Sequence, residues 1–115
     1  MLPKKFRLRR KEDVEAVFKG GESIIAPELI LRFRPNTLET SRVAILVGKK
    51  LAKKAVQRNR LKRRIGELAR IHFAQIPTGF DLLIVVREIK LLETEFAEIE
   101  KIFLALLQKW TNRNS

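Results

Sequence analysis

The side chains best suited to a chemical role in this chain are the cations between Lys49 and Arg64. Nine residues of that stretch are Lys or Arg, and none is acidic. Apolar residues such as Leu51 and Leu61 interrupt the cations, which indicates a folded segment and not a disordered tail. Phosphate backbones are the commonest polyanion in a cell, and neutralising them releases counterions that drive binding. The stretch therefore predicts a surface that binds nucleic acid.

The spacing of these cations strengthens that prediction. Arg63 and Arg64 follow Arg60 by three and four residues, so on a helix both repel Arg60 with no acid nearby. A helix tolerates this cost most readily when a partner supplies the counter-charge. Arginine contacts phosphate in a bidentate manner, and Asn59 is placed to contact a sugar or a base. The alternative, a solvated charged face, is typical of shorter runs of charge.

Residues for protein-based catalysis are scarce. The chain has no cysteine and a single histidine, which excludes disulfides, thiol catalysis and cysteine zinc sites. Hydrolysis of phosphodiesters needs clustered carboxylates for metals or a pair of histidines. Glu12, Asp13 and Glu15 are instead explained by the dipole at the start of a helix. His72 falls on an apolar helix face, where a packed structural histidine is the more frequent case. We expect no catalytic residue and no protein-bound metal.

Composition favours one small folded domain spanning residues 1–115. The chain is 45% hydrophobic and carries a net charge of +12, concentrated in residues 4–11 and 49–64. No apolar run approaches the roughly 18 residues of a membrane span, and the basic N-terminus leads into acids instead of an apolar signal region. We therefore expect a cytoplasmic protein without membrane association.

Hydrophobic periodicity predicts an α+β fold in the order α-β-β-β-α-β-α. The expected helices run from about Arg10 to Lys19, from about Lys53 to Phe73, and along the C-terminal segment from Phe96 to Trp110, with Thr94 as N-cap. The expected strands cover residues 22–26, 29–34, 42–47 and 80–87. The long helix between the last two strands permits a parallel crossover.

The long central helix is predicted to be amphipathic. At 100° per residue, Leu61, Ile65 and Leu68 share one face with His72. Arg60, Arg63 and Arg70 gather on the opposite face, whereas Arg58 projects near the apolar edge. The apolar face should pack on the sheet, which argues against a peripheral membrane-binding helix.

Three segments closely resemble the protein subunit of bacterial ribonuclease P: LPKKFRLRRKEDVEAVFKGG, GKKLAKKAVQRNRLKRRIGE and GFDLLIVVR. The resemblance covers nearly the whole chain, and the signature from Lys54 to Arg63 is highly specific. It implies one four-stranded sheet with three helices and a left-handed βαβ crossover around the basic helix, although general rules favour a right-handed one. It also implies an accessory protein that joins a catalytic RNA in a 1:1 complex, with Mg²⁺ held mainly by the RNA.

The activity implied by the resemblance is endonucleolytic removal of the 5′ leader from precursor tRNA. Residues expected to contact the catalytic RNA are Lys49, Lys50, Lys53, Lys54, Arg58, Asn59, Arg60, Lys62, Arg63 and Arg64. A cleft between the first helix and the sheet is expected to bind the leader through Phe6, Arg7, Arg9, Val14, Phe18 and Arg87, and strand alternation adds Arg32 and Arg34.

The sequence departs from the family pattern at three positions. Gly48 and Gly66 replace the usual serine and arginine, and Val14 replaces a common phenylalanine, so this position offers no ring to the leader. Phe18 is as compatible with a core position as with a binding position. A second class of function, a ribosomal or RNA-chaperone protein without a role in cleavage, is also compatible with a basic surface.

Overall fold

Three α-helices and four strands make up the computed structural model, which describes residues 2–113. Short 3-10 turns accompany them at Lys4–Phe6 (η1), Phe73–Gln75 (η2) and Ile89–Leu92 (η3). The helices are α1 (Lys11–Gly20), α2 (Ala55–Ile71) and α3 (Phe96–Arg113), and the strands are β1 (Glu22–Ile25), β2 (Leu29–Pro35), β3 (Arg42–Leu46) and β4 (Phe80–Val86). The predicted α+β class and element order are confirmed.

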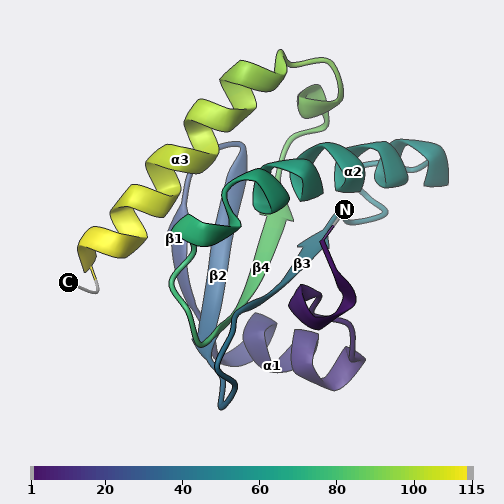
Figure 1. The fold of residues 1–115 in the computed structure, drawn as a ribbon. Helices are drawn as coiled ribbons and strands as arrows, with labels where there is room; N and C mark the ends of the chain where they lie inside the picture. The colour runs from purple at the N-terminus through teal and green to yellow at the C-terminus, as the bar shows by residue number, and fades with distance from the viewer. Residues whose placement is uncertain (1, 114–115) are drawn as a thin grey trace.

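The strands form one mixed sheet in the order β1-β2-β4-β3. β1 and β2 are antiparallel, as are β2 and β4, whereas β3 and β4 run parallel with Arg42 opposite Asp81. With α2 in front of the sheet, both parallel strands point upward and β4 lies to the left of β3 (Figure 1). The β3-α2-β4 crossover is therefore left-handed, as the family resemblance implied and contrary to the general rule.

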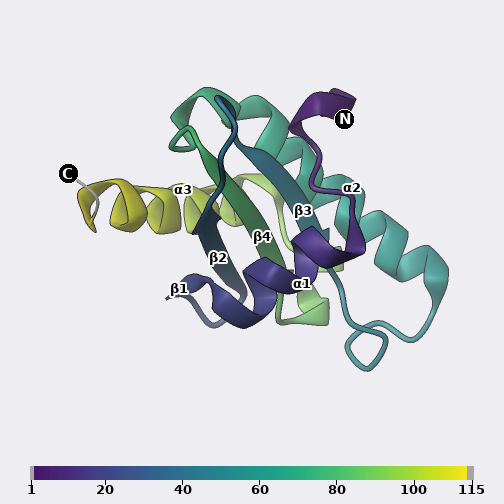
Figure 2. The ribbon, with the colours of Figure 1, turned by 90° about the horizontal axis from the view of Figure 1, so that it is seen from below.

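The two faces of the sheet are covered by different helices. α2 and α3 lie on one face and α1 lies on the other (Figures 1 and 2). Alternation along β2 sends Leu29, Leu31 and Phe33 into the core beneath α2 and α3. There Phe33 stacks on Trp110 with 4.4 Å between ring centroids. This face holds the main core of the protein.

The face beneath α1 has a much smaller apolar cluster. Its buried members are Leu8, Val17 and Leu83, with half-buried neighbours including Val14 and Val85. Few apolar side chains therefore fix α1 to the sheet, and polar contacts carry more of that role.

Gly21 ends α1 where the chain comes close to β2. Its N–H donates to the Val17 carbonyl at 2.9 Å. A Cβ at this position would lie 2.6 Å from the Val17 carbonyl oxygen and 2.8 Å from that of Phe33. Only glycine fits this approach, which sets the direction in which the chain enters β1.

Residues 2–10 run along the open edge of β3 and pass from the α2 face to the α1 face (Figure 2). Arg7 forms a single parallel bridge with Val43, and the Leu8 N–H donates to the Val43 carbonyl at 2.9 Å. Leu2 belongs to the main core and Leu8 to the small cluster. The segment thus covers part of an edge that would otherwise be unpaired.

The predicted element boundaries agree with the structure to within a few residues, and the N-cap of α3 is the exception. Glu95 precedes α3, and its carbonyl accepts the N–H groups of Glu98 and Ile99. Thr94 lies one residue earlier, and its hydroxyl donates to the Lys90 carbonyl at 2.8 Å. The N-cap prediction for Thr94 is therefore wrong, because that hydroxyl closes the preceding turn. Among the described residues, no helix is long and apolar enough to cross a bilayer.

Candidate nucleic-acid interface

The outer face of α2 carries exposed cations that lack partners inside the protein. Leu61, Ile65 and Leu68 are fully buried against the sheet, as the helical projection predicted. The side chains on the other face are exposed and, within residues 2–113, make no hydrogen bond or ion pair with protein; they are Asn59, Arg60, Lys62 and Arg63. Unpaired guanidinium and ammonium groups at helical spacing form a surface suited to phosphates. We call this set the α2 cationic face.

Arg58 and Arg64 flank this face but point toward the protein backbone. Arg58 donates to the carbonyls of Ala52 and Lys53 at 2.8 and 3.0 Å. Arg64 donates to the carbonyls of Leu91, Leu92 and Thr94 at 2.5, 2.8 and 2.5 Å, so it fastens the η3 turn to α2. Both were predicted to contact RNA; that role stays a prediction, and the structure gives both arginines a role in the fold.

The loop before α2 extends the cationic surface. Lys49, Lys50, Lys53 and Lys54 are all exposed there. The N–H groups of Leu51 and Ala52 both donate to the Gly48 carbonyl, and Ala52 is fully buried. The loop is therefore anchored at its centre, while its four lysines face solvent beside the α2 cationic face.

Four of the predicted leader-binding residues gather on the α1 face of the sheet. Arg32 donates to the Val17 and Phe18 carbonyls at 3.1 and 2.6 Å, and also to the Ser23 hydroxyl at 2.7 Å. It therefore holds the C-terminal end of α1, where a cation is also favoured by the helix dipole. Arg34 projects from the same face and is exposed, whereas Val14 is half-buried. Phe18 is 53% exposed, so it is not a core residue.

The other four predicted leader-binding residues lie in the N-terminal segment and directly after β4. Phe6 packs on Phe73 with 4.5 Å between ring centroids, at the margin of the core on the α2 side. Arg7 donates to the Leu2 carbonyl at 2.6 Å, and Arg9 is exposed. Arg87 follows β4 and donates to the Ala26 carbonyl at 3.2 Å. The structure does not bring Phe6 next to Phe18, although both were assigned to one cleft.

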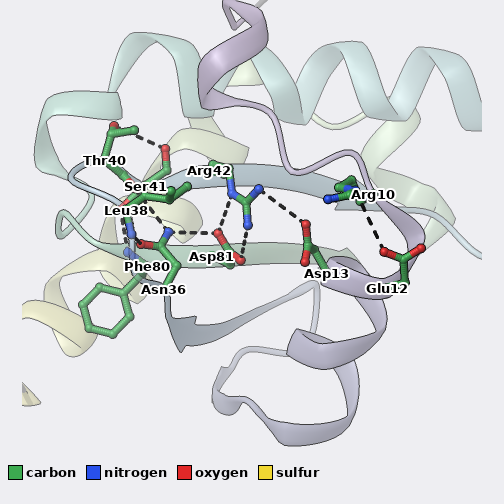
Figure 3. A network of polar contacts seen from close by, with 10 residues as sticks. All are labelled: Arg10, Glu12, Asp13, Asn36, Leu38, Thr40, Ser41, Arg42, Phe80 and Asp81. Atoms are coloured by element: carbon green, nitrogen blue, oxygen red, sulfur yellow. Dashed lines mark hydrogen bonds and ion pairs between the residues drawn. The ribbon is translucent and has the colours of Figure 1, made fainter.

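A partly buried ion pair on the α1 face was not anticipated from the sequence. The Arg42 guanidinium donates to both carboxylate oxygens of Asp81, at 2.9 and 2.7 Å, and to Asp13 of α1 at 3.4 Å (Figure 3). The hydrogen bonds that Arg42 donates to Asp81 raise the pKa of Arg42 above its ordinary value, and partial burial opposes this change. Asn36 adds a donor to Asp81 at 3.0 Å. This network ties α1 to the sheet.

A signal for the pair was present in the sequence. Asp81 is the lone acid of an apolar strand, and Arg42 begins the strand expected to run parallel to it. Opposite charges at matching positions of adjacent parallel strands face the same side of the sheet, so their pairing was foreseeable. The structure places the two residues in direct register.

His72, predicted to be a packed structural residue on the apolar face of the long helix, is half-buried in the structure. It follows α2 directly, and its Nε2 lies 2.7 Å from Glu100 of α3. Its Nδ1 accepts a hydrogen bond from the Gln75 amide at 3.1 Å. Both ring nitrogens are therefore engaged with protein groups. In the described part of the chain, no three His, Cys, Asp or Glu side chains group together as metal ligands.

A cationic helix braced on a four-stranded sheet defines a small α+β protein with a surface for polyanions. A family model for ribonuclease P matches residues 2–111. The ribonuclease P protein component of Thermotoga petrophila is 38% identical over 106 residues, covering 92% of this chain and 86% of the relative. That of Roseiflexus castenholzii is 33% identical, with 94% and 88% covered. This chain belongs to the ribonuclease P protein family.

Solved structures of the family share this fold. The ribonuclease P protein of Thermotoga maritima superposes with a TM-score of 0.79 at 36% identity, covering 90% of this chain and 96% of that one. The protein from Staphylococcus aureus gives 0.77 at 25% identity, covering 90% and 93%. The element order and the mixed sheet are therefore those of bacterial ribonuclease P proteins.

Proposed function

We propose that this protein binds the catalytic RNA of ribonuclease P through the α2 cationic face and the lysines that precede it. The observation that carries the proposal is the set of exposed cations, including Arg60 and Arg63, that have no protein partner within residues 2–113. Each contact with a phosphate would release condensed counterions, so affinity should fall steeply with salt. The buried face of α2 keeps the helix rigid while it presents these charges.

The 5′ leader of precursor tRNA is proposed to lie on the α1 face. A single strand is held by a positive groove together with aromatic platforms for its bases. Phe18 offers an exposed ring and Arg34 an exposed cation, while Arg32 holds the backbone that carries Phe18. Val14 offers no ring at the position where the family often has one. Leader recognition should therefore depend mainly on Phe18.

In this proposal the protein assists cleavage without performing it. Its described acids do not assemble into a metal site, and the ring nitrogens of His72 are both engaged. No step is therefore assigned to a metal held by the protein; Mg²⁺ is expected on the RNA. We also propose a protein monomer that forms a 1:1 complex with RNA in the cytoplasm.

A reconstituted cleavage assay tests the proposal. Precursor tRNA is incubated at low Mg²⁺ with the protein alone, with the cognate catalytic RNA alone, and with both together. The expected result is no cleavage by the protein and stimulation of the RNA when the protein is added. Failure to stimulate the cognate RNA would contradict the proposal.

The identity of the RNA that co-purifies with the protein separates the two classes of function. One defined RNA species of several hundred bases supports ribonuclease P, whereas ribosomal RNA supports a ribosomal or chaperone role. The RNA is identified by sequencing the nucleic acid that remains bound at moderate salt.

A further inference from the structure

A groove lies between the N-terminal segment, the edge of β3 and α2, and its lining includes Leu8 and Ala44 of the cluster beneath α1. It has a volume of about 660 Å³, which is within the range of small-ligand pockets. Its apolar wall includes Leu2, Val43 and Ile45, and its rim carries four cations: Arg7, Arg9, Lys62 and Arg63. An apolar interior with a cationic rim matches a nucleotide, whose base is largely apolar on its faces and whose phosphate is anionic.

Glu67 is the one acid in the lining of this groove, and its charge is already compensated. Arg70 donates to Glu67 Oε1 through its Nε at 2.9 Å and also through a second guanidinium nitrogen. These hydrogen bonds lower the pKa of Glu67 and keep the carboxylate ionised and paired. The four rim cations are therefore not balanced from within the groove, and an anion is the complementary occupant.

The edge of β3 supplies hydrogen-bonding groups to the same groove. The Val43 carbonyl points outward, because it accepts the Leu8 N–H across the edge. Ile45, two residues further, points its backbone N–H and C=O to the same side, where the described N-terminal segment forms no further bridge. An edge donor and acceptor next to an apolar wall are suited to reading the edge of a base.

Gly66 keeps the groove open. It lies inside α2 and lines the groove, and a Cβ built there meets no atom within 4 Å. Packing therefore does not require glycine at this position, and glycine is unfavourable in a helix interior. Any long side chain at residue 66 would project into the cavity.

We propose that this groove binds one unpaired nucleotide of the catalytic RNA, with the base against Val43 and Ile45 and the phosphate at Arg63 and Arg9. The catalytic RNA is favoured over the leader because Lys62 and Arg63 of the rim belong to the α2 cationic face, whereas Phe18, Arg32 and Arg34, proposed above to hold the leader, do not line the groove. The inference rests on the proposed function and adds a base-binding pocket to its electrostatic surface.

The test compares Gly66→Leu, which fills the groove without changing charge, with Gly66→Ala, which adds only a methyl group. Both substitutions raise helix propensity, so thermal denaturation should show both variants folded. Binding to the catalytic RNA is measured by filter retention or fluorescence. Gly66→Ala should bind within about two-fold of the unmodified protein, and Gly66→Leu about ten-fold more weakly, which is about 1.4 kcal/mol.

The variant Arg60→Ala distinguishes failure of the groove inference from failure of the proposed function, because Arg60 does not line the groove. If Gly66→Leu binds normally while Arg60→Ala is weakened, the groove inference is overturned and the proposed function stands. If the unmodified protein itself does not bind the catalytic RNA, the proposed function fails.

A second measurement does not depend on the folding of any variant. In the assembled ribonucleoprotein, 4-thiouridine in the RNA is photo-crosslinked and the modified peptide is identified by mass spectrometry. Each uridine of the RNA is replaced in turn by 4-thiouridine. A crosslink from one unpaired nucleotide to residues 43–46 supports the groove proposal, and the absence of such a crosslink from every position contradicts it. Sedimentation of the protein alone checks whether a second copy pairs with the β3 edge; a dimer that Gly66→Leu abolishes would overturn the RNA assignment.

Discussion

The two faces of the sheet differ in how they are held together and in how they use their cations. Beneath α2 and α3 lies a continuous apolar core, and Arg60, Lys62 and Arg63 of the α2 cationic face make no hydrogen bond or ion pair with protein within residues 2–113. Beneath α1 the apolar cluster is small, and Arg32 and Arg42 bind protein carbonyls and carboxylates. The α2 side therefore leaves Arg60 and Arg63 available for a partner while Arg64 binds backbone carbonyls. On the α1 side, Arg32 and Arg42 both hold the fold together.

The largest predicted difference is in the cost of removing a core residue from each face. Phe33→Ala should lower the free energy of unfolding by about 3–5 kcal/mol, because Phe33 is buried against Trp110 and Phe80. Val17→Ala on the α1 face removes two methyl groups and should cost about 2 kcal/mol. Urea denaturation measures both; equal costs would remove the contrast between the faces.

The ion pair on the α1 face should be the next most sensitive feature. Asp81→Ala leaves the partly buried Arg42 guanidinium without its main partner and should cost about 3 kcal/mol of stability. Arg10→Ala is the matched control, because the Arg10–Glu12 pair is exposed at 3.9 Å and should contribute less than about 1 kcal/mol. Chemical denaturation of both variants checks this order. If Asp81→Ala left the free energy of unfolding unchanged, the ion pair would not stabilise the α1 face.

Two arginines of α2 are expected to differ in their roles, Arg64 in stability of the fold and Arg60 in RNA binding. Arg64→Ala removes three hydrogen bonds to the backbone around η3 and should lower the free energy of unfolding by about 2 kcal/mol. Arg60→Ala should change stability by less than about 0.5 kcal/mol, because the side chain is exposed and unpaired with protein. Thermal or urea denaturation of the two variants measures the difference.

Binding to the catalytic RNA should rank these two variants in the opposite order. Under conditions in which both are folded, Arg60→Ala should weaken binding more than Arg64→Ala. Arg60→Ala should weaken binding to the catalytic RNA and lower the slope of log affinity against log salt by about 1. If Arg60→Ala unfolds the protein and leaves RNA affinity unchanged, the orientation assigned to α2 is wrong.

The smallest effect is expected at Glu67 and Arg70. Their hydrogen bonds lower the pKa of Glu67 in the folded protein, so the stabilisation is present above the unfolded-state pKa, about 4.3, and is lost as pH falls through the lowered folded value. In Arg70→Gln the pKa of Glu67 should rise toward its ordinary value. An NMR titration of the Glu67 carboxylate in both proteins measures the change.

The sequence was sufficient for the fold class, the element order and the orientation of α2, because each depends on local periodicity. Leu61, Ile65 and Leu68 identified the buried face of α2 from spacing alone. The left-handed crossover could not be obtained in this way. It depends on how the connections around α2 pack, and general statistics favour the opposite hand.

The assignment of individual cations was less complete, because the sequence shows spacing but not the partners reached by long side chains. Arg58 and Arg64 belong to the basic run, yet their guanidinium groups donate to backbone carbonyls up to 30 residues away. Phe6 lies near the basic N-terminal block in sequence, but it packs on Phe73 from a distant turn. Contacts of this range are set by tertiary structure.

The small apolar cluster beneath α1 has a consequence for local opening of the protein. Segments with few buried contacts open separately from the rest of a protein, at a free energy below that of global unfolding. The backbone amides of Lys11–Gly20 should therefore exchange with deuterium sooner than those in the centre of α2. A strand of RNA lying along this helix would close that opening, so protection from exchange would report occupancy of this face directly.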